Sequence, residues 1–77
     1  MNALYPVAPP LDLAPIANEI DRQFGRRLRE FSIDAGEHGL VLSGVAPSFY
    51  VKQLAQHAVM KRVSLPIAAN EIEVLRT

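Results

Sequence analysis

The side chains that most often carry catalysis or bind metals are few in this chain, and their contexts do not assemble a site. His38 falls in a glycine-flanked turn and His57 in a helical segment, and neither has a second histidine at helical spacing. The chain has no cysteine, which excludes thiolate metal sites and a cysteine nucleophile. No serine stands in a nucleophile elbow, and no glycine-rich phosphate loop is present. We therefore predict a protein that is not an enzyme and that needs no cofactor or metal.

Acidic residues are expected on one face of a sheet, because strand alternation sets them opposite their apolar neighbours. They are Glu30, Asp34, Glu71 and Glu73. Clustered acids could bind a divalent cation or take part in acid–base chemistry, and a solvated sheet face is the interpretation that we favour. The same face is expected to carry an apolar strip of Val41, Val45 and Leu75. Such a surface suits a protein partner or a second copy of the chain.

Basic residues gather near the ends of two predicted helices. Arg22, Arg26, Arg27 and Arg29 form the first group, and Lys61 and Arg62 form the second. Antiparallel helices would separate the groups. Roughly parallel helices would merge them into one patch for phosphate groups, lipid or nucleic acid, where arginine makes bidentate contacts. The other interpretation is that these residues complement the helix dipoles and have local partners, such as Glu19 for Arg22.

Phe49 is expected in the first turn of the second helix, away from its apolar stripe and near Lys52. An exposed aromatic beside a lysine could enter a membrane interface or a protein pocket. In a first helical turn it could equally fold back onto the core. The candidate binding residues are Arg26, Arg27, Arg29, Phe49, Lys52, Lys61 and Arg62, with Val41, Val45 and Leu75 as the alternative interface.

The spacing of apolar residues predicts the elements that must position these side chains. They are a helix over residues 12–25, strands over 29–35 and 40–45 joined by a turn at 36–39, a helix over 49–62 and a strand over 70–74. Asp12 and Ser48 are expected to cap the helices, and Gly25 to end the first one. We predict an α+β fold of order α-β-β-α-β, with a hairpin, a three-stranded mixed sheet and two helices packed on one face. The order of the strands is left open.

Three stretches of the sequence resemble the BON domain, a family of small bacterial α/β modules linked with phospholipid and cell-envelope binding. The first is Gly39-Leu40-Val41-Leu42-Ser43-Gly44-Val45-Ala46, followed by Ser48 at the start of a helix; the second is Leu54, Ala55 and Ala58; the third is Asn70-Glu71-Ile72-Glu73-Val74. Residues 64–67 depart from the glycine-valine turn that the family usually has before its last strand. The resemblance implies association with phospholipid or envelope surfaces. In this register Gly44 and Ala46 would allow the second helix to approach the sheet closely.

Length and charge limit what else the chain can be. Its 77 residues allow one domain, which we place at residues 12–77 after a proline-rich arm at residues 1–11 that is either loose or lies over a neighbouring surface. The 8 Lys+Arg balance the 8 Asp+Glu, so binding to lipid or nucleic acid must come from a local patch. Nucleic acid is disfavoured, because the acidic sheet face lacks stacking aromatics. Without a signal peptide we expect a cytoplasmic protein, or an envelope protein if the chain is part of a longer one.

Overall fold

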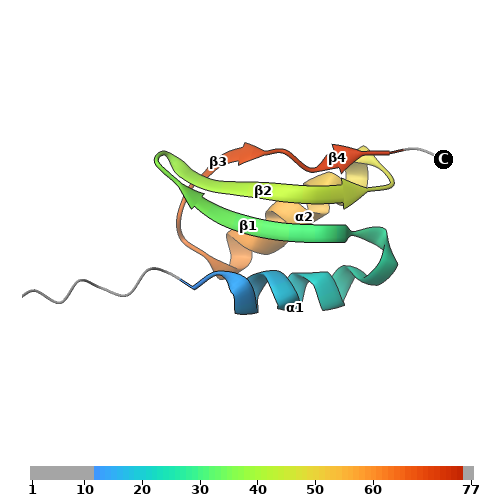
Figure 1. The fold of residues 1–77 in the computed structure, drawn as a ribbon, viewed down its shortest axis with the longest axis horizontal. Helices are drawn as coiled ribbons and strands as arrows, with labels where there is room; N and C mark the ends of the chain where they lie inside the picture. Colours follow the sequence, from blue (N-terminus) through green and yellow to red (C-terminus); the bar gives the residue numbers. More distant parts are fainter. Residues whose placement is uncertain (1–11, 76–77) are drawn as a thin grey trace, which may run out of the picture.

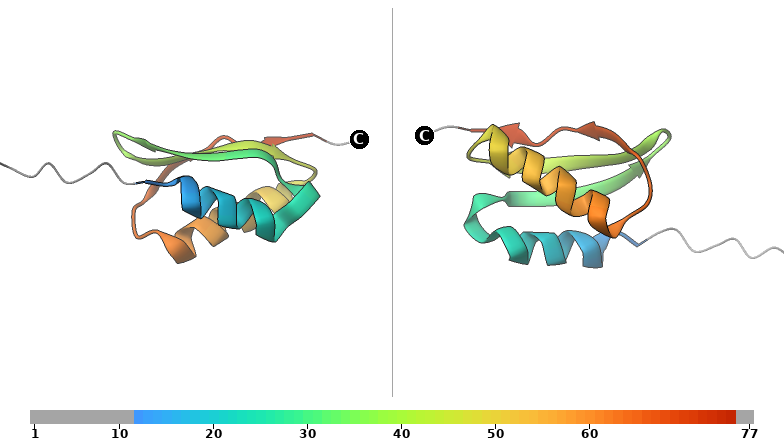
Figure 2. Two further views of the ribbon diagram at one scale, coloured as in Figure 1. Left: turned by 60° about the horizontal axis from the view of Figure 1, so that its bottom comes forward. Right: turned by 180° about the vertical axis from the view of Figure 1, so that it is seen from behind.

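The computed structural model describes residues 12–75, so the predicted arm at residues 1–11 lies outside the described residues. The elements are α1 (Ala14–Phe24), a 3-10 turn η1 (Gly25–Arg27), β1 (Arg29–Gly36), β2 (Gly39–Ala46), α2 (Phe49–Arg62), β3 (Ile67–Asn70) and β4 (Glu73–Val74). Both helices lie on one side of a mixed four-stranded sheet, and the other side is open (Figure 1, Figure 2). The α+β class and the element order are confirmed.

The ends of the helices follow from local residue types. Leu13 takes the N-cap position of α1, while the Asp12 carboxylate accepts a hydrogen bond from the Ala14 N–H at 3.2 Å. Gly25, with φ 58°, ends this helix as expected. Ser48 is the N-cap of α2, and its hydroxyl accepts a hydrogen bond from the Val51 N–H at 3.2 Å. The cap prediction is thus confirmed at α2, whereas at α1 Asp12 acts from one position further out.

The sheet is built around β2. β1 pairs with it antiparallel, as the predicted hairpin requires, and β3 and β4 pair with its other edge in parallel. The prediction of three strands is therefore short by one, because the last strand is divided in two. Asn70 divides it: its amide donates to the Lys52 carbonyl at 3.2 Å and to Gln56 Oε1 at 3.1 Å on α2. Its Oδ1 accepts the Ile72 N–H at 3.2 Å, which turns the chain between β3 and β4.

The hydrophobic core lies between the sheet and the two helices, and alternation along the strands selects its members. From the strand segments come Ile33, Leu40, Leu42, Ala46 and Ile72, and from the helices Ala17, Ile20, Phe24, Val51, Ala55, Ala58 and Val59. No helix within residues 12–75 has both the length and the apolar character needed to cross a membrane.

A bulge near the start of β1 corrects the expected role of Gly44. The register shifts between Arg29 and Ser32, and Glu30 takes a positive φ of 55° there. A Cβ on Gly44 would lie 3.0 Å from the Arg29 carbonyl oxygen and 3.2 Å from Phe31 Cα. Gly44 therefore allows β2 to approach the bulge of β1. The expectation that it makes room for α2 is wrong.

Candidate functional site

Several chain reversals meet at one end of the molecule (Figure 1). Here α1 ends and turns through η1 into β1, β2 passes into α2, and β4 ends. The residues that these segments present are Arg26, Arg27, Arg29, Pro47, Phe49, Tyr50 and Leu75. We call this surface the arginine–aromatic end.

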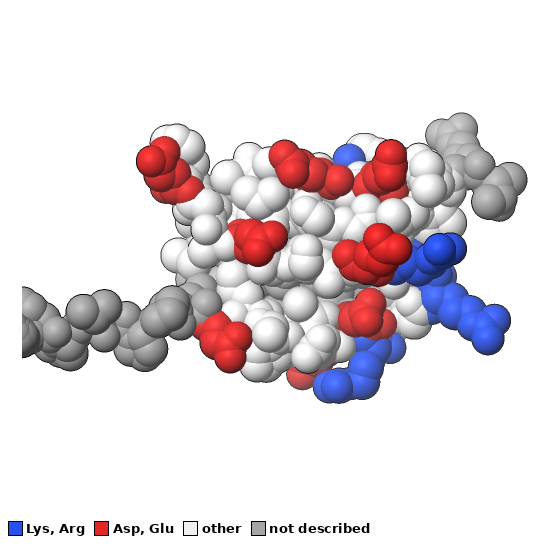
Figure 3. Space-filling model, in the orientation of Figure 1, with Lys and Arg blue, Asp and Glu red and all other residues white. Residues whose placement is uncertain are grey.

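The arginines of this end surround a small pocket. Arg26, Arg27 and Arg29 line a hollow of about 160 Å³ together with Val45, Ala46, Pro47 and Leu75. Within residues 12–75 the ion pairs are Glu37–His38 and Glu19–Arg62, so none of these three arginines has a carboxylate partner there. The Arg27 guanidinium lies 5.4 Å from the centre of the Phe24 ring. Figure 3 shows basic side chains gathered at this end, with acidic ones beside them and across the rest of the same face.

The aromatic side chains of this end point into solvent. Phe49 is 59% exposed, Tyr50 68% and Leu75 51%. The alternative in which Phe49 folds back onto the core is therefore wrong. Sequence reasoning missed Tyr50, although its place beside Val51, which faces the core, signals an outward side chain on a helix. Lys52 follows Phe49 by one helical turn and is half-buried.

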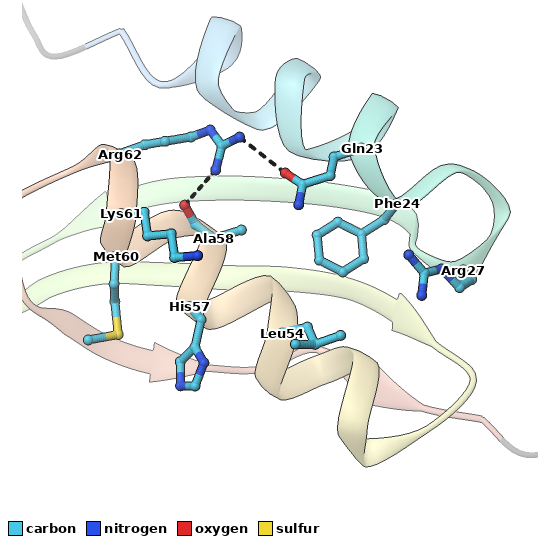
Figure 4. A pocket seen from close by; sticks show the side chains of 9 residues that line it. All are labelled: Gln23, Phe24, Arg27, Leu54, His57, Ala58, Met60, Lys61 and Arg62. Carbon is cyan, nitrogen blue, oxygen red and sulfur yellow. Dashed lines mark hydrogen bonds between the residues drawn. The ribbon is translucent and has the colours of Figure 1, made fainter.

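A second hollow of about 520 Å³ lies between α1 and α2 (Figure 4). Phe24, Leu54, Ala58 and Met60 supply apolar surface, and the polar lining is Gln23, Arg27, His57, Lys61 and Arg62. The helices run in opposite directions, so Lys61 and Arg62 lie toward the far end of the molecule from Arg26 and Arg29 (Figure 2). The two basic groups are thus separated, and only Arg27 reaches the same hollow as the second group.

Arg62 is used to join the helices. Its Nε donates to Glu19 Oε1 at 2.7 Å, one terminal nitrogen donates to Gln23 Oε1 at 3.1 Å, and the other donates to the Ala58 carbonyl at 2.9 Å. The hydrogen bond and the positive charge of Arg62 lower the pKa of the Glu19 carboxyl. The prediction of Arg62 as a binding residue is therefore revised, since each of its three nitrogens already donates a hydrogen bond within the fold.

The open face of the sheet is less apolar than expected. Asp34 lies opposite Val41, and Val45 lies opposite Glu73, so acids and valines alternate across the strands. Both valines are half-buried, and Leu75 belongs to the arginine–aromatic end. Among residues 12–75 no three His, Asp or Glu side chains lie close enough to hold a metal ion.

Comparisons with protein-family models, with curated proteins and with solved structures found no match to this chain. The resemblance to the BON domain therefore stays a prediction from the sequence. Function is argued below from the geometry and charge of the surfaces themselves.

Proposed function

We propose that this protein is a non-catalytic binding module that associates with anionic phospholipid surfaces through its arginine–aromatic end. The observation that carries the proposal is that three arginines without a described carboxylate partner lie at the same end of the molecule as exposed Phe49, Tyr50 and Leu75. Aromatic rings favour the headgroup level of a bilayer, and guanidinium groups bind phosphate oxygens in pairs. The end therefore offers both kinds of contact on one surface.

The distribution of charge supports one orientation on the membrane. Asp34 and Glu37 lie toward the hairpin tip, so docking by the arginine–aromatic end leaves them in water. Glu30, which follows Arg29, and Glu73, which pairs with Val45, stand beside the arginines (Figure 3) and offset part of the attraction. Each arginine near an anionic surface contributes about 1 kcal/mol, so the three together supply about 3 kcal/mol. Such binding is reversible and weakens with salt, because counterions screen exposed charges.

Co-sedimentation with vesicles tests the proposal. The vesicles contain either phosphatidylcholine alone or equal parts of phosphatidylcholine and phosphatidylglycerol, at low and high salt. We expect binding to the anionic vesicles only, lost at high salt. Arg26→Glu should reduce binding strongly, whereas Lys61→Glu, an equal charge reversal toward the other end, should reduce it less. Absence of salt-sensitive binding, or equal losses in the two variants, would refute the proposal.

The exposed apolar side chains need their own variant pair. Phe49→Ser should weaken binding to the same vesicles, because it removes apolar surface from the membrane-facing end. Leu65→Ser is the matched control, since Leu65 is also exposed but lies in the loop between α2 and β3. An equal effect of the two substitutions would show that Phe49 does not touch the bilayer.

A further inference from the structure

β1 is the outer strand of the described sheet, and the register locates its outward backbone groups. The Leu40 N–H donates to the Pro66 carbonyl and the Leu42 carbonyl accepts the Glu71 N–H, each at 2.8 Å. Leu40 and Leu42 thus direct these groups away from β1. In an antiparallel ladder, opposite residues share this orientation. Ala35 and Ile33 lie opposite them, so their N–H and C=O groups point outward from the free edge.

A groove of about 380 Å³ runs along this edge, between β1 and α1. Five consecutive residues of β1, 31–35, form one wall. Leu13, Ala14, Ala17 and Asn18 form the other wall, and the two alanines leave room beside the strand. α1 follows the edge along much of its length (Figure 1). An added strand would therefore find hydrogen-bonding groups on one side and a helix beneath it.

The charge around the groove is acidic. Asp34 is the charged residue in its lining, and no lysine or arginine is part of that lining. Glu30 stands just before the strand wall, while on α1 Asp21 and Arg22 follow Asn18 by three and four residues and offset each other. Figure 3 shows acidic side chains over both the sheet and α1 on this side. The groove thus favours a positively charged occupant.

We propose that this edge binds an extended basic peptide by strand addition, a function separate from lipid association. The peptide runs antiparallel to β1, so the residues that bond to Ile33 and Ala35 lie directly opposite them and direct their side chains to the same face, toward α1. The residues between them lie on the open face beside Asp34. The peptide should therefore carry apolar residues at one set of alternate positions and Lys or Arg at the other.

Two other occupants fit the groove less well. Residues 1–11 of this chain contain no Lys or Arg and include three prolines, which lack the donor that strand pairing needs. A second copy pairing through its own β1 would bring the acids of both edges together, and like charges across a strand pair are destabilising.

The test uses the full chain and the peptide acetyl-Lys-Val-Lys-Val-Lys-Val-Lys amide, followed by amide NMR. We expect shifts and slowed exchange at the Ile33 and Ala35 amides on titration. Methylating the backbone nitrogens of the valines should abolish binding, because those N–H donors face β1. Methylating the backbone nitrogens of the lysines should leave binding unchanged. Asp34→Lys should weaken binding about fivefold or more, and Glu37→Lys, the same reversal at the hairpin tip, should change it less.

The opposite results would overturn the inference. One such result is that the amide shifts on titration fall outside β1 and α1. The other is that the two methylated peptides bind equally well. Protection of the Ile33 and Ala35 amides in the free protein, by residues 1–11 or by a second copy, would show that the edge is already occupied. Sedimentation velocity separates those two causes. Loss of vesicle binding alone leaves this inference intact, since the surfaces are distinct.

Discussion

Gly39→Ala should be among the most damaging single-methyl additions to this fold. Gly39 begins β2 with φ 140°, a conformation that L side chains rarely adopt. A Cβ there would lie 2.4 Å from the Pro66 carbonyl oxygen, the acceptor that holds Leu40. Backbone strain of about 1–3 kcal/mol and overpacking of about 1–3 kcal/mol add to about 2–6 kcal/mol, with a midpoint of about 4 kcal/mol. A domain of this size has a net stability of only about 3–5 kcal/mol, so the variant should be close to unfolded.

Urea and thermal unfolding followed by circular dichroism measure the effect. At the midpoint of about 4 kcal/mol the unfolding temperature should fall by about 16–32 °C, since each kcal/mol shifts it by about 4–8 °C in a domain of this size. Gly36→Ala, at the other side of the same turn, is the control. Its Cβ would lie 3.3 Å from the Gly39 carbonyl oxygen, with no positive φ, so the cost should stay below about 1 kcal/mol. Equal stability of the two variants would refute the packing of β2 against Pro66.

Three further predictions concern single side chains. Asn70→Ala should lower the free energy of unfolding in urea by about 2–3 kcal/mol, because three partly buried hydrogen bonds are lost. No change in this free energy would mean that the bonds do not stabilise the turn between β3 and β4. Glu30→Gly should raise stability by about 0.5–1 kcal/mol, since glycine tolerates its positive φ, and Glu30→Ala should not. The lowered pKa of Glu19 means that its bond to Arg62 stabilises the fold above the ordinary pKa of glutamate and is lost as the pH falls through the lowered value. In the Glu19→Gln variant the free energy of unfolding should therefore fall less steeply as the pH is lowered below about pH 5. An unchanged pH dependence would show that the Glu19–Arg62 bond does not stabilise the fold.

Local signals in the sequence were enough for most of the elements. Gly25 predicted the end of α1, Ser48 predicted the start of α2, and the spacing of apolar residues predicted the two strands of the hairpin. These features depend on a few neighbouring residues and on backbone conformations that the residue types favour. The division of the last strand could not be found this way, because Asn70 turns the chain by bonding to a helix distant in sequence.

The candidate site was only partly predictable for the same reason. The run from Arg26 to Arg29 is visible in the sequence, whereas the sequence leaves the direction of the Phe49 side chain open. That both lie at one end depends on the directions of β1, β2 and α2. Arg62 looked like a member of the basic surface. Its partner Glu19 lies 43 residues away, so no local pattern reveals the pair.

The central claim is that the arginine–aromatic end enters the interface of an anionic membrane. The chain has no tryptophan, so Phe49→Trp introduces a single reporter at this end and Leu65→Trp introduces one away from it. With vesicles of phosphatidylcholine and phosphatidylglycerol at low salt, the emission of the Phe49→Trp protein should move to shorter wavelength and be quenched by brominated lipids. The emission of the Leu65→Trp protein should stay unchanged. No shift at position 49, or a larger one at position 65, would contradict the account.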